Sequence, residues 1–168
     1  MHDESQMDAL APVHAAVAAA SHSAVVTTFT PLAAETQVMV TVPVEDYVAV
    51  VEAAKETGFV TFLDLCAIDH LGREPRFDVV VNLLSTEHGE RVLIKVQLPS
   101  ETPEMPTISP VFTGADFYER EMWDMFGIVF TGHPDLSRIL MPDEWEGHPL
   151  RKDFRVGAIP VEFKEARR

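Results

Sequence analysis

The sequence has a single cysteine, Cys66, and no long run of apolar residues. A membrane-spanning helix needs about 20 mostly apolar residues, and no stretch reaches that length. One cysteine excludes an internal disulfide and cannot hold an iron–sulfur cluster, which takes about four protein ligands. Because Cys66 lies in an apolar stretch, we expect a buried structural thiol and not a nucleophile. The acidic start, Met-His-Asp-Glu, is not typical of a secretory signal, and we expect a soluble, cytoplasmic protein.

The sequence also lacks nucleotide-binding motifs and has few basic residues. It contains no Gly-x-Gly-x-x-Gly, Walker or Gly-x-Ser-x-Gly motif. The 13 Lys and Arg face 27 Asp and Glu, which gives a net charge of −14. Residues 138–168 hold seven basic and six acidic residues and sum to +1, so the remainder carries −15. An acidic body repels phosphates and argues against nucleic acid as a partner.

The length of 168 residues fits one ordinary domain and a tail. We predict three parts: an Ala-rich helical segment at 1–23, an α+β domain at 24–130 and an extended partner-binding tail at 131–168. The overall prediction is an α+β fold with a mostly antiparallel sheet covered by helices and an extended C-terminal strap.

Hydrophobic periodicity supports this fold class. Val44, Tyr47, Val48, Val51 and Ala54 recur at helical spacing, so we predict a helix that ends near residue 58. β-branched or alternating segments predict strands at 24–30, 36–42, 59–68, 76–84 and 91–98. The short connections between the last three favour antiparallel neighbours.

The chain changes character after residue 98. Four prolines within 99–110 predict an extended connector, and four more in 128–168 exclude a long helix there. Between them, residues 114–127 predict a helix that begins near Asp116 and ends at Gly127. Its charged residues fit a solvated face, but Trp123, Met125 and Phe126 make it apolar on more than one side. We infer that its second surface meets a protein partner.

The candidate chemical groups lie between Gly132 and Phe154, where Gly-His-Pro occurs twice. Oxygen and nitrogen ligands for a metal, or acid–base groups, are offered by His133, Asp135, Asp143, Glu144, Glu146 and His148. No characteristic spacing joins the two histidines, so hydrogen bonds in turns are the favoured interpretation. A stand-alone metal-dependent enzyme that uses His133, Asp135 and His148 is the remote alternative.

The stretch "YEREMWDMFGIVFTGHPDLSRILMPDEWEGHPLRKDF", residues 118–154, closely resembles the signature of the C-type subunit of respiratory complex I, the proton-translocating NADH:quinone oxidoreductase. "DLCAIDH", "RFDVVVNLLS" and "GAIPVEFK" are similar to the same family more loosely. Ser137 departs from the family, which often has a basic residue there, and Phe154 stands where tyrosine is common.

The resemblance implies a scaffold subunit of the peripheral arm, at the cytoplasmic face of the cell membrane, held there only through the complex. It implies neighbours that form the quinone pocket and hold the terminal cluster, with FMN and iron–sulfur clusters in partner subunits. No catalytic, cofactor or metal residue is expected in this chain. The equivalent subunit of a membrane-bound hydrogenase or a ferredoxin- or F420-linked dehydrogenase is the alternative. The predicted partner-binding residues are Glu119, Arg120, Trp123, Asp124, Phe126, His133, Arg138, Trp145, His148, Arg151, Lys152 and Phe154.

Overall fold

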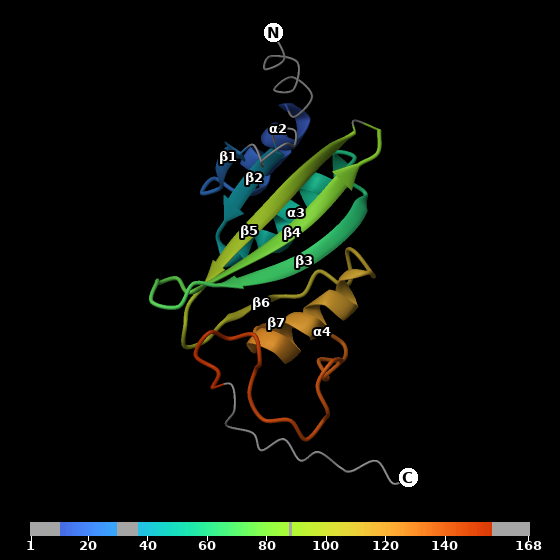
Figure 1. Ribbon diagram of the computed structural model, residues 1–168. Coiled ribbons are helices and arrows are strands. Elements are labelled where there is room, and N and C mark those ends of the chain that lie inside the picture. The colour runs from blue at the N-terminus through green and yellow to red at the C-terminus, as the bar shows by residue number, and fades with distance from the viewer. Residues whose placement is uncertain (1–10, 30–36, 88, 156–168) are drawn as a thin grey trace.

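The fold is built on a mixed five-stranded sheet, seen in the computed structural model in Figure 1. The structure describes residues 11–29, 37–87 and 89–155. Its elements are α2 (Ala11–Ala20), β1 (Val25–Phe29), β2 (Gln37–Val42), η1 (Val44–Asp46), α3 (Tyr47–Glu56), β3 (Thr61–Asp69), β4 (Phe77–Ser85), β5 (Glu90–Leu98), β6 (Glu104–Pro106), α4 (Ala115–Phe126) and β7 (Val129–Thr131).

The strands of the large sheet follow the order β1-β2-β5-β4-β3. The pairs β1–β2, β5–β4 and β4–β3 are antiparallel, and β2 runs parallel to β5. The parallel pair arises because the chain leaves β2 through α3 and reaches β3 at the far edge, before two hairpins return it to β5. The predicted α+β class and the mostly antiparallel sheet are confirmed.

The main core lies between the sheet and α3, which passes behind β4 and β5 in Figure 1. On α3, Tyr47, Val50, Val51 and Ala54 are buried, at the spacing of one helix face. On β5, Val92, Ile94, Val96 and Leu98 are buried in alternation, as the period-2 pattern predicts. Gly58 follows the helix with a φ of 100°, a conformation that glycine adopts without steric cost.

The prediction that Cys66 is buried is wrong, because its thiol is exposed. Cys66 lies on the edge strand β3, opposite Val80 of β4, and its neighbour Leu65 points into the core. Successive side chains of a strand point to opposite faces, so an apolar run does not reveal which face each residue takes. Partial desolvation, followed by the nearby carboxylate of Asp64, raises the pKa of the thiol.

The second structural unit is formed by α4 and the two short strands β6 and β7, which lie beside β3 in Figure 1. The proline-rich connector contains β6, and it pairs in parallel with β7, an arrangement that sequence periodicity did not predict. Helix α4 packs on β3 through an edge-to-face contact of Phe62 and Tyr118, with ring centroids 5.3 Å apart. Gly127 ends α4 in the left-handed conformation, as predicted.

After β7, the segment 132–155 contains no regular helix or strand, which agrees with the predicted strap. We call this segment the strap. The strap contacts α4 near the end of that helix, where the backbone amide of Leu150 donates a hydrogen bond of 3.0 Å to the carbonyl of Met125. Helix α2 lies inside the predicted N-terminal helical segment, whereas residues 1–10 and the tail beyond residue 155 fall outside the described residues. Within the described ranges, no helix has both the length and the apolar character that a membrane span requires.

Candidate functional site

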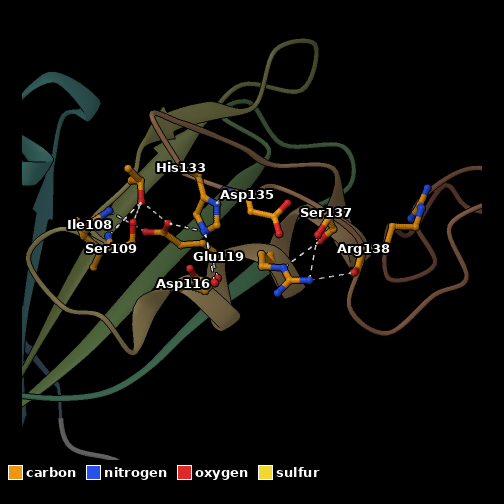
Figure 2. Close-up of polar contacts among 10 residues, drawn as sticks. Ile108, Ser109, Asp116, Glu119, His133, Asp135, Ser137 and Arg138 are labelled. Atoms are coloured by element: carbon orange, nitrogen blue, oxygen red, sulfur yellow. Dashed lines mark hydrogen bonds and ion pairs between the residues drawn. The ribbon is translucent and has the colours of Figure 1, made fainter.

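The first polar centre surrounds Glu119 of α4, whose side chain is fully buried. Its carboxylate accepts hydrogen bonds from the Thr107 hydroxyl at 2.5 Å and from the Ile108 amide at 2.8 Å. Figure 2 shows the side chains of Glu119 and His133 pointing toward each other, with the His133 Nε2 atom 3.7 Å from Oε2 of Glu119. The carboxylate thus joins α4 to the segment after β6 and to the start of the strap.

Burial is the largest influence on the pKa of the Glu119 carboxyl. Desolvation raises the pKa of its carboxyl, and the Thr107, Ile108 and His133 contacts oppose the shift without cancelling it. The His133 side chain has no exposed surface, and its Nε2 lies 3.3 Å from the Asp116 carbonyl oxygen. The other ring nitrogen, Nδ1, accepts a hydrogen bond from the Asp135 amide at 3.1 Å. Both nitrogens of His133 are therefore occupied by contacts within the chain.

The second polar centre surrounds Asp124, which follows Glu119 on α4 and is also fully buried. Its Oδ2 atom accepts hydrogen bonds from the consecutive amides of Ile139, Leu140 and Met141 at 3.1, 2.9 and 2.9 Å. Its Oδ1 atom is 2.5 Å from Nη1 of Arg138. Burial raises the pKa of this carboxyl, but the amides and Arg138 outweigh it, so the pKa is lowered.

Arg138 distributes its donors over the strap. Besides Asp124, its Nη2 donates to the carbonyl of Trp145 at 2.6 Å and to that of Gly147 at 3.3 Å. The guanidinium also lies over the ring of Trp123, 5.5 Å from the centroid. A planar guanidinium with several donors suits such a node, because it can satisfy several acceptors at once.

The third polar centre holds the end of the strap. Arg76 binds Asp69 through two hydrogen bonds of 2.8 and 2.7 Å, and it binds Asp153 through two of 2.9 Å. Asp69 also accepts from the Lys152 amide at 2.8 Å. These contacts lower the pKa of Asp69 and hold that of Asp153 at about 2. The strap is thus fastened to the β3–β4 hairpin as well as to α4.

Each Gly-His-Pro repeat places its glycine at a positive φ, 83° for Gly132 and 88° for Gly147. His148 follows Gly147 and its Nδ1 atom lies 3.0 Å from the Asp124 carbonyl oxygen. The rings of Trp145 and Phe154 stack at a centroid distance of 6.4 Å on either side of this turn. The two histidines therefore make hydrogen bonds in turns, as expected.

The candidate metal ligands do not gather. In the part of the chain that the structure describes, no three His, Cys, Asp or Glu side chains are arranged to hold a metal ion. His133 and His148 instead contact different carbonyl groups of α4, those of Asp116 and Asp124. The stand-alone enzyme with His133, Asp135 and His148 receives no support from this geometry.

The predicted partner-binding residues separate by exposure. Glu119 and Asp124 are fully buried and Phe126 is nearly so, which leaves them no surface for a partner in this conformation. The reason is that α4 turns these side chains toward the sheet and the strap, and not toward solvent. Lys152 is exposed, and partial exposure is shared by Arg120, Trp123, Arg138, Trp145, His148, Arg151 and Phe154, whereas the side chain of His133 is buried. Ser137 stands where the family often has a basic residue, and its hydroxyl accepts a 3.0 Å hydrogen bond from Arg120.

Sequence reasoning missed two groups of residues. Asp69, Arg76 and Asp153 were not singled out, because no local pattern joins residues so far apart along the chain. Phe117 and Leu140 were also missed, although both are strongly exposed apolar side chains. The signal that could have found Phe117 is its place on the polar side of the α4 pattern, away from Met122 and Met125.

Comparison with known proteins gives consistent matches. Residues 40–159 match the family described as the respiratory-chain NADH dehydrogenase, 30 Kd subunit. The C-type subunit of NADH-quinone oxidoreductase from Roseiflexus castenholzii is 55% identical over 100 residues, covering 60% of this chain and 58% of that protein. The same subunit from Rhizobium johnstonii is 51% identical over 110 residues, covering 65% and 54%. The matched part thus spans little more than half the length of these curated relatives.

Solved structures agree with the fold. A trypsin-resistant fragment of Nqo5 (1-134) is 32% identical, with a TM-score of 0.65, over 76% of this chain and 99% of the fragment. A chain of the archaeal membrane-bound sulfane sulfur reductase shares the fold, with a TM-score of 0.73 and 24% identity over 92% of this chain and 94% of its own length. Because the family match covers most of the sequence and includes α4 and the strap, the chain belongs to the family of the 30 Kd subunit of respiratory-chain NADH dehydrogenase.

Proposed function

We propose that this chain is the 30 Kd, C-type component of the peripheral arm of an NADH:quinone oxidoreductase and that its own role is that of a scaffold. In such a complex, electrons pass from NADH through FMN and iron–sulfur clusters to a quinone, coupled to proton translocation. The chain would hold none of these cofactors, which would lie in partner subunits. The family membership supports this assignment.

The observation that carries the scaffold role is the way the strap is fixed. Buried carboxylates of Glu119, Asp124 and Asp69 each bind backbone amides or side chains of segments that lack regular structure. An irregular segment normally loses conformational freedom when it binds a partner. Here the chain itself has already ordered the strap, while Leu140 and Leu150 remain exposed. This is the arrangement expected of a pre-organised docking surface.

The neighbours we propose are the subunits that form the quinone pocket and hold the terminal cluster. The net charge of −14 would be repelled by the anionic inner leaflet of a membrane. Attachment to the cytoplasmic face of the cell membrane would therefore depend on the complex. The exposed part of the predicted partner-binding set, with Trp145 and Lys152 in the strap and Trp123 on α4, would supply the contacts.

The test is to tag the chain in its native host, purify it gently and identify the proteins that accompany it. We expect flavin- and cluster-bearing subunits, NADH oxidation with a quinone acceptor, and iron in the preparation. A set containing a hydrogenase or ferredoxin-linked subunits would change the electron donor and contradict the NADH assignment. A lone protein would contradict the scaffold role.

A strap variant sharpens the test. Leu150→Asp places a charge on an exposed side chain of the strap and should reduce the yield of accompanying subunits about tenfold. Val60→Asp, at a similarly exposed apolar residue just before β3, is the matched control and should leave the yield unchanged. The strap account fails if the complex with Leu150→Asp is recovered at the yield of the unaltered chain.

A further inference from the structure

An apolar groove of about 230 Å³ lies between α4 and the strap. Phe117, Tyr118 and Glu121 of α4 line one side, and Ile139 and Leu140 of the strap line the other. Phe117 is 60% exposed, Leu140 61% and Ile139 38%, so each presents a large apolar side chain to solvent. Such clustered exposure is typical of an interaction site and differs from apolar residues scattered singly over a surface.

The backbone of the strap side of this groove is fixed by a buried charge. The two residues that line it, Ile139 and Leu140, donate their amides to the Oδ2 atom of Asp124, which is fully buried. The Met141 amide donates to the same oxygen. Moving a carboxylate out of water into the protein interior costs free energy. Here the buried carboxylate of Asp124 accepts three backbone hydrogen bonds, and they fix the backbone of Ile139 and Leu140, whose side chains are exposed. The arrangement stabilises an exposed apolar surface instead of a core.

The other end of this segment is fixed from α4 as well. Arg120 donates to the carbonyl and hydroxyl oxygens of Ser137 and to the carbonyl of Arg138, at 3.3, 3.0 and 3.2 Å. Its guanidinium lies 6.0 Å from the ring centroid of Phe117. Figure 2 labels Ser137 and Arg138, the two strap residues that accept these hydrogen bonds. The groove therefore has two walls, one helical and one irregular, that the chain holds in a fixed relation before any partner arrives.

The accessible charge of the groove is negative. Glu121 lines it and forms no ion pair with any residue in the described ranges. The nearby cations are already used, since Arg138 is paired with Asp124 and Arg120 binds strap oxygens. Asp143 and Glu144 follow in the strap, and both are exposed. A basic group on a partner would find the unpaired carboxylate of Glu121 here, whereas an acidic group would be repelled.

We propose that this groove docks an apolar segment of a neighbouring subunit that carries lysine or arginine beside its apolar side chains. This inference rests on the proposed scaffold function, and it adds the kind of segment that binds in the groove between α4 and the strap. The apolar side chains of that segment enter between Phe117 and Leu140, and its basic group pairs with Glu121. Because both walls are already ordered, binding costs little conformational entropy.

The test uses the tagged chain in its native host, with two variants from different elements. Phe117→Asp changes the α4 wall, and an acid in the first turn of a helix is favourable, so the helix is retained. Leu140→Gln changes the strap wall without adding charge. Each should lower the recovery of the neighbouring subunit about tenfold, with the melting temperature of the isolated chain unchanged.

Leu71→Gln is the matched control, since Leu71 is 55% exposed but lies in the β3–β4 turn. Full recovery of the neighbour with Phe117→Asp and Leu140→Gln overturns the groove. Equal loss with Leu71→Gln also overturns it, because the effect would not be specific to this face. If the unaltered chain recovers no subunits at all, the scaffold function itself fails, which separates the two failures.

Cross-linking tests the chemistry of the occupant. With p-benzoylphenylalanine in place of Phe117, the purified complex should yield on irradiation a cross-linked peptide with Lys or Arg beside apolar residues. A peptide from a second copy of this chain, or an acidic peptide, overturns the proposal. Glu121→Gln should weaken recovery at low salt and match the unaltered chain in high salt, where an exposed ion pair is screened.

Discussion

Arg76, the residue before β4, donates two hydrogen bonds of 2.9 Å to Asp153 of the strap, 77 positions further along the chain. The same guanidinium donates two hydrogen bonds to Asp69 at the end of β3. Arg76 and Asp69 are buried, whereas the side chain of Asp153 is 49% exposed. The Arg76 guanidinium thus joins the buried carboxylate of Asp69 on the sheet to the partly solvated carboxylate of Asp153 on the strap. Because the two carboxylates differ in burial, we expect them to differ in their contribution to stability.

The first prediction concerns this inequality. Asp69→Asn leaves Arg76 buried with only a half-exposed counter-charge, and we expect the free energy of unfolding to fall by about 3 kcal/mol. Asp153→Asn removes a partly solvated partner and should cost about 1 kcal/mol or less. Urea denaturation of the two variants measures the difference. Equal losses would contradict the proposed order of importance.

The second prediction is a loss of stability in acid. The hydrogen bonds with Arg76 hold the pKa of Asp153 at about 2 and lower that of Asp69. Carboxyls with a lowered pKa in the folded state stabilise it above their unfolded pKa of about 4 and lose this contribution as the pH falls through the folded value. The free energy of unfolding should therefore fall between about pH 4 and pH 2. Asp153→Asn should flatten that slope, and an unchanged slope would show that the pair is not linked to acid stability.

Glu119 supplies the third prediction, with the opposite sign. Burial raises the pKa of its carboxyl, so its contribution is fully present below the unfolded pKa and is lost as the pH rises through the folded value. Glu119→Gln cannot ionise, yet its Oε1 can still accept from the Ile108 amide. As the pH rises from about 4, we expect the free energy of unfolding of this variant to increase relative to that of the unaltered chain. Urea unfolding at several pH values measures the gain.

Glu119→Ala is the control for that comparison. It leaves the Ile108 amide without its buried acceptor, which costs about 1–3 kcal/mol, whereas the Thr107 hydroxyl can still donate to the Ser109 hydroxyl at 2.9 Å. The alanine variant should be less stable at every pH. If the free energy of unfolding of Glu119→Gln instead depended on pH in the same way as that of the unaltered chain, the Glu119 carboxyl would have the same pKa in the folded and unfolded states.

The fourth prediction tests the position of Cys66. An exposed thiol reacts with a maleimide without denaturant, although the raised pKa keeps the thiolate fraction small at neutral pH. We expect complete labelling of the native protein, more slowly than free cysteine and faster as the pH rises. A thiol that reacts only after unfolding would restore the interpretation of a buried cysteine.

The pattern of successes and failures follows the range of the interactions. The helix over Tyr47–Glu56 and the buried alternation on β5 were predictable, because each depends on a period of a few residues. The face taken by Cys66 was not, since the apolar run around it fits either register. The short strands β6 and β7 have three residues each, too few for a period to show.

The candidate site shows the same limit more clearly. Glu119 and Asp124 occur among charged residues on α4, a pattern that by itself indicates a solvated face. Asp124 is bound by the strap, which supplies Arg138 and the amides of Ile139, Leu140 and Met141 from more than a dozen positions away. Glu119 is bound by Thr107 and Ile108, which lie 12 and 11 positions before it in the chain. The resemblance of residues 118–154 to a known family identified the segment, but only the structure separates internal anchors from exposed side chains.

The last prediction concerns the corner between α4 and β7. Gly127 has a φ of 74°, and a Cβ atom there would lie 2.6 Å from two ring atoms of His148, closer than real contacts allow. Gly72 has a similar φ of 89° but open space around it, so Gly72→Ala isolates the backbone cost, about 1 kcal/mol. Gly127→Ala should cost about 3 kcal/mol, because it adds the loss of the His148 contact with the Asp124 carbonyl.

Urea denaturation of Gly127→Ala and Gly72→Ala, with the NMR signals of the His148 ring, measures both parts of this effect. The Gly127 variant alone should shift the ring signals, since its methyl group displaces the imidazole from α4. Equal stability losses with unshifted signals would mean that the ring is not held against the corner. A larger loss with shifted signals would show that the second Gly-His-Pro repeat fastens the strap to the end of α4, and that the corner requires glycine for space as well as for its backbone conformation.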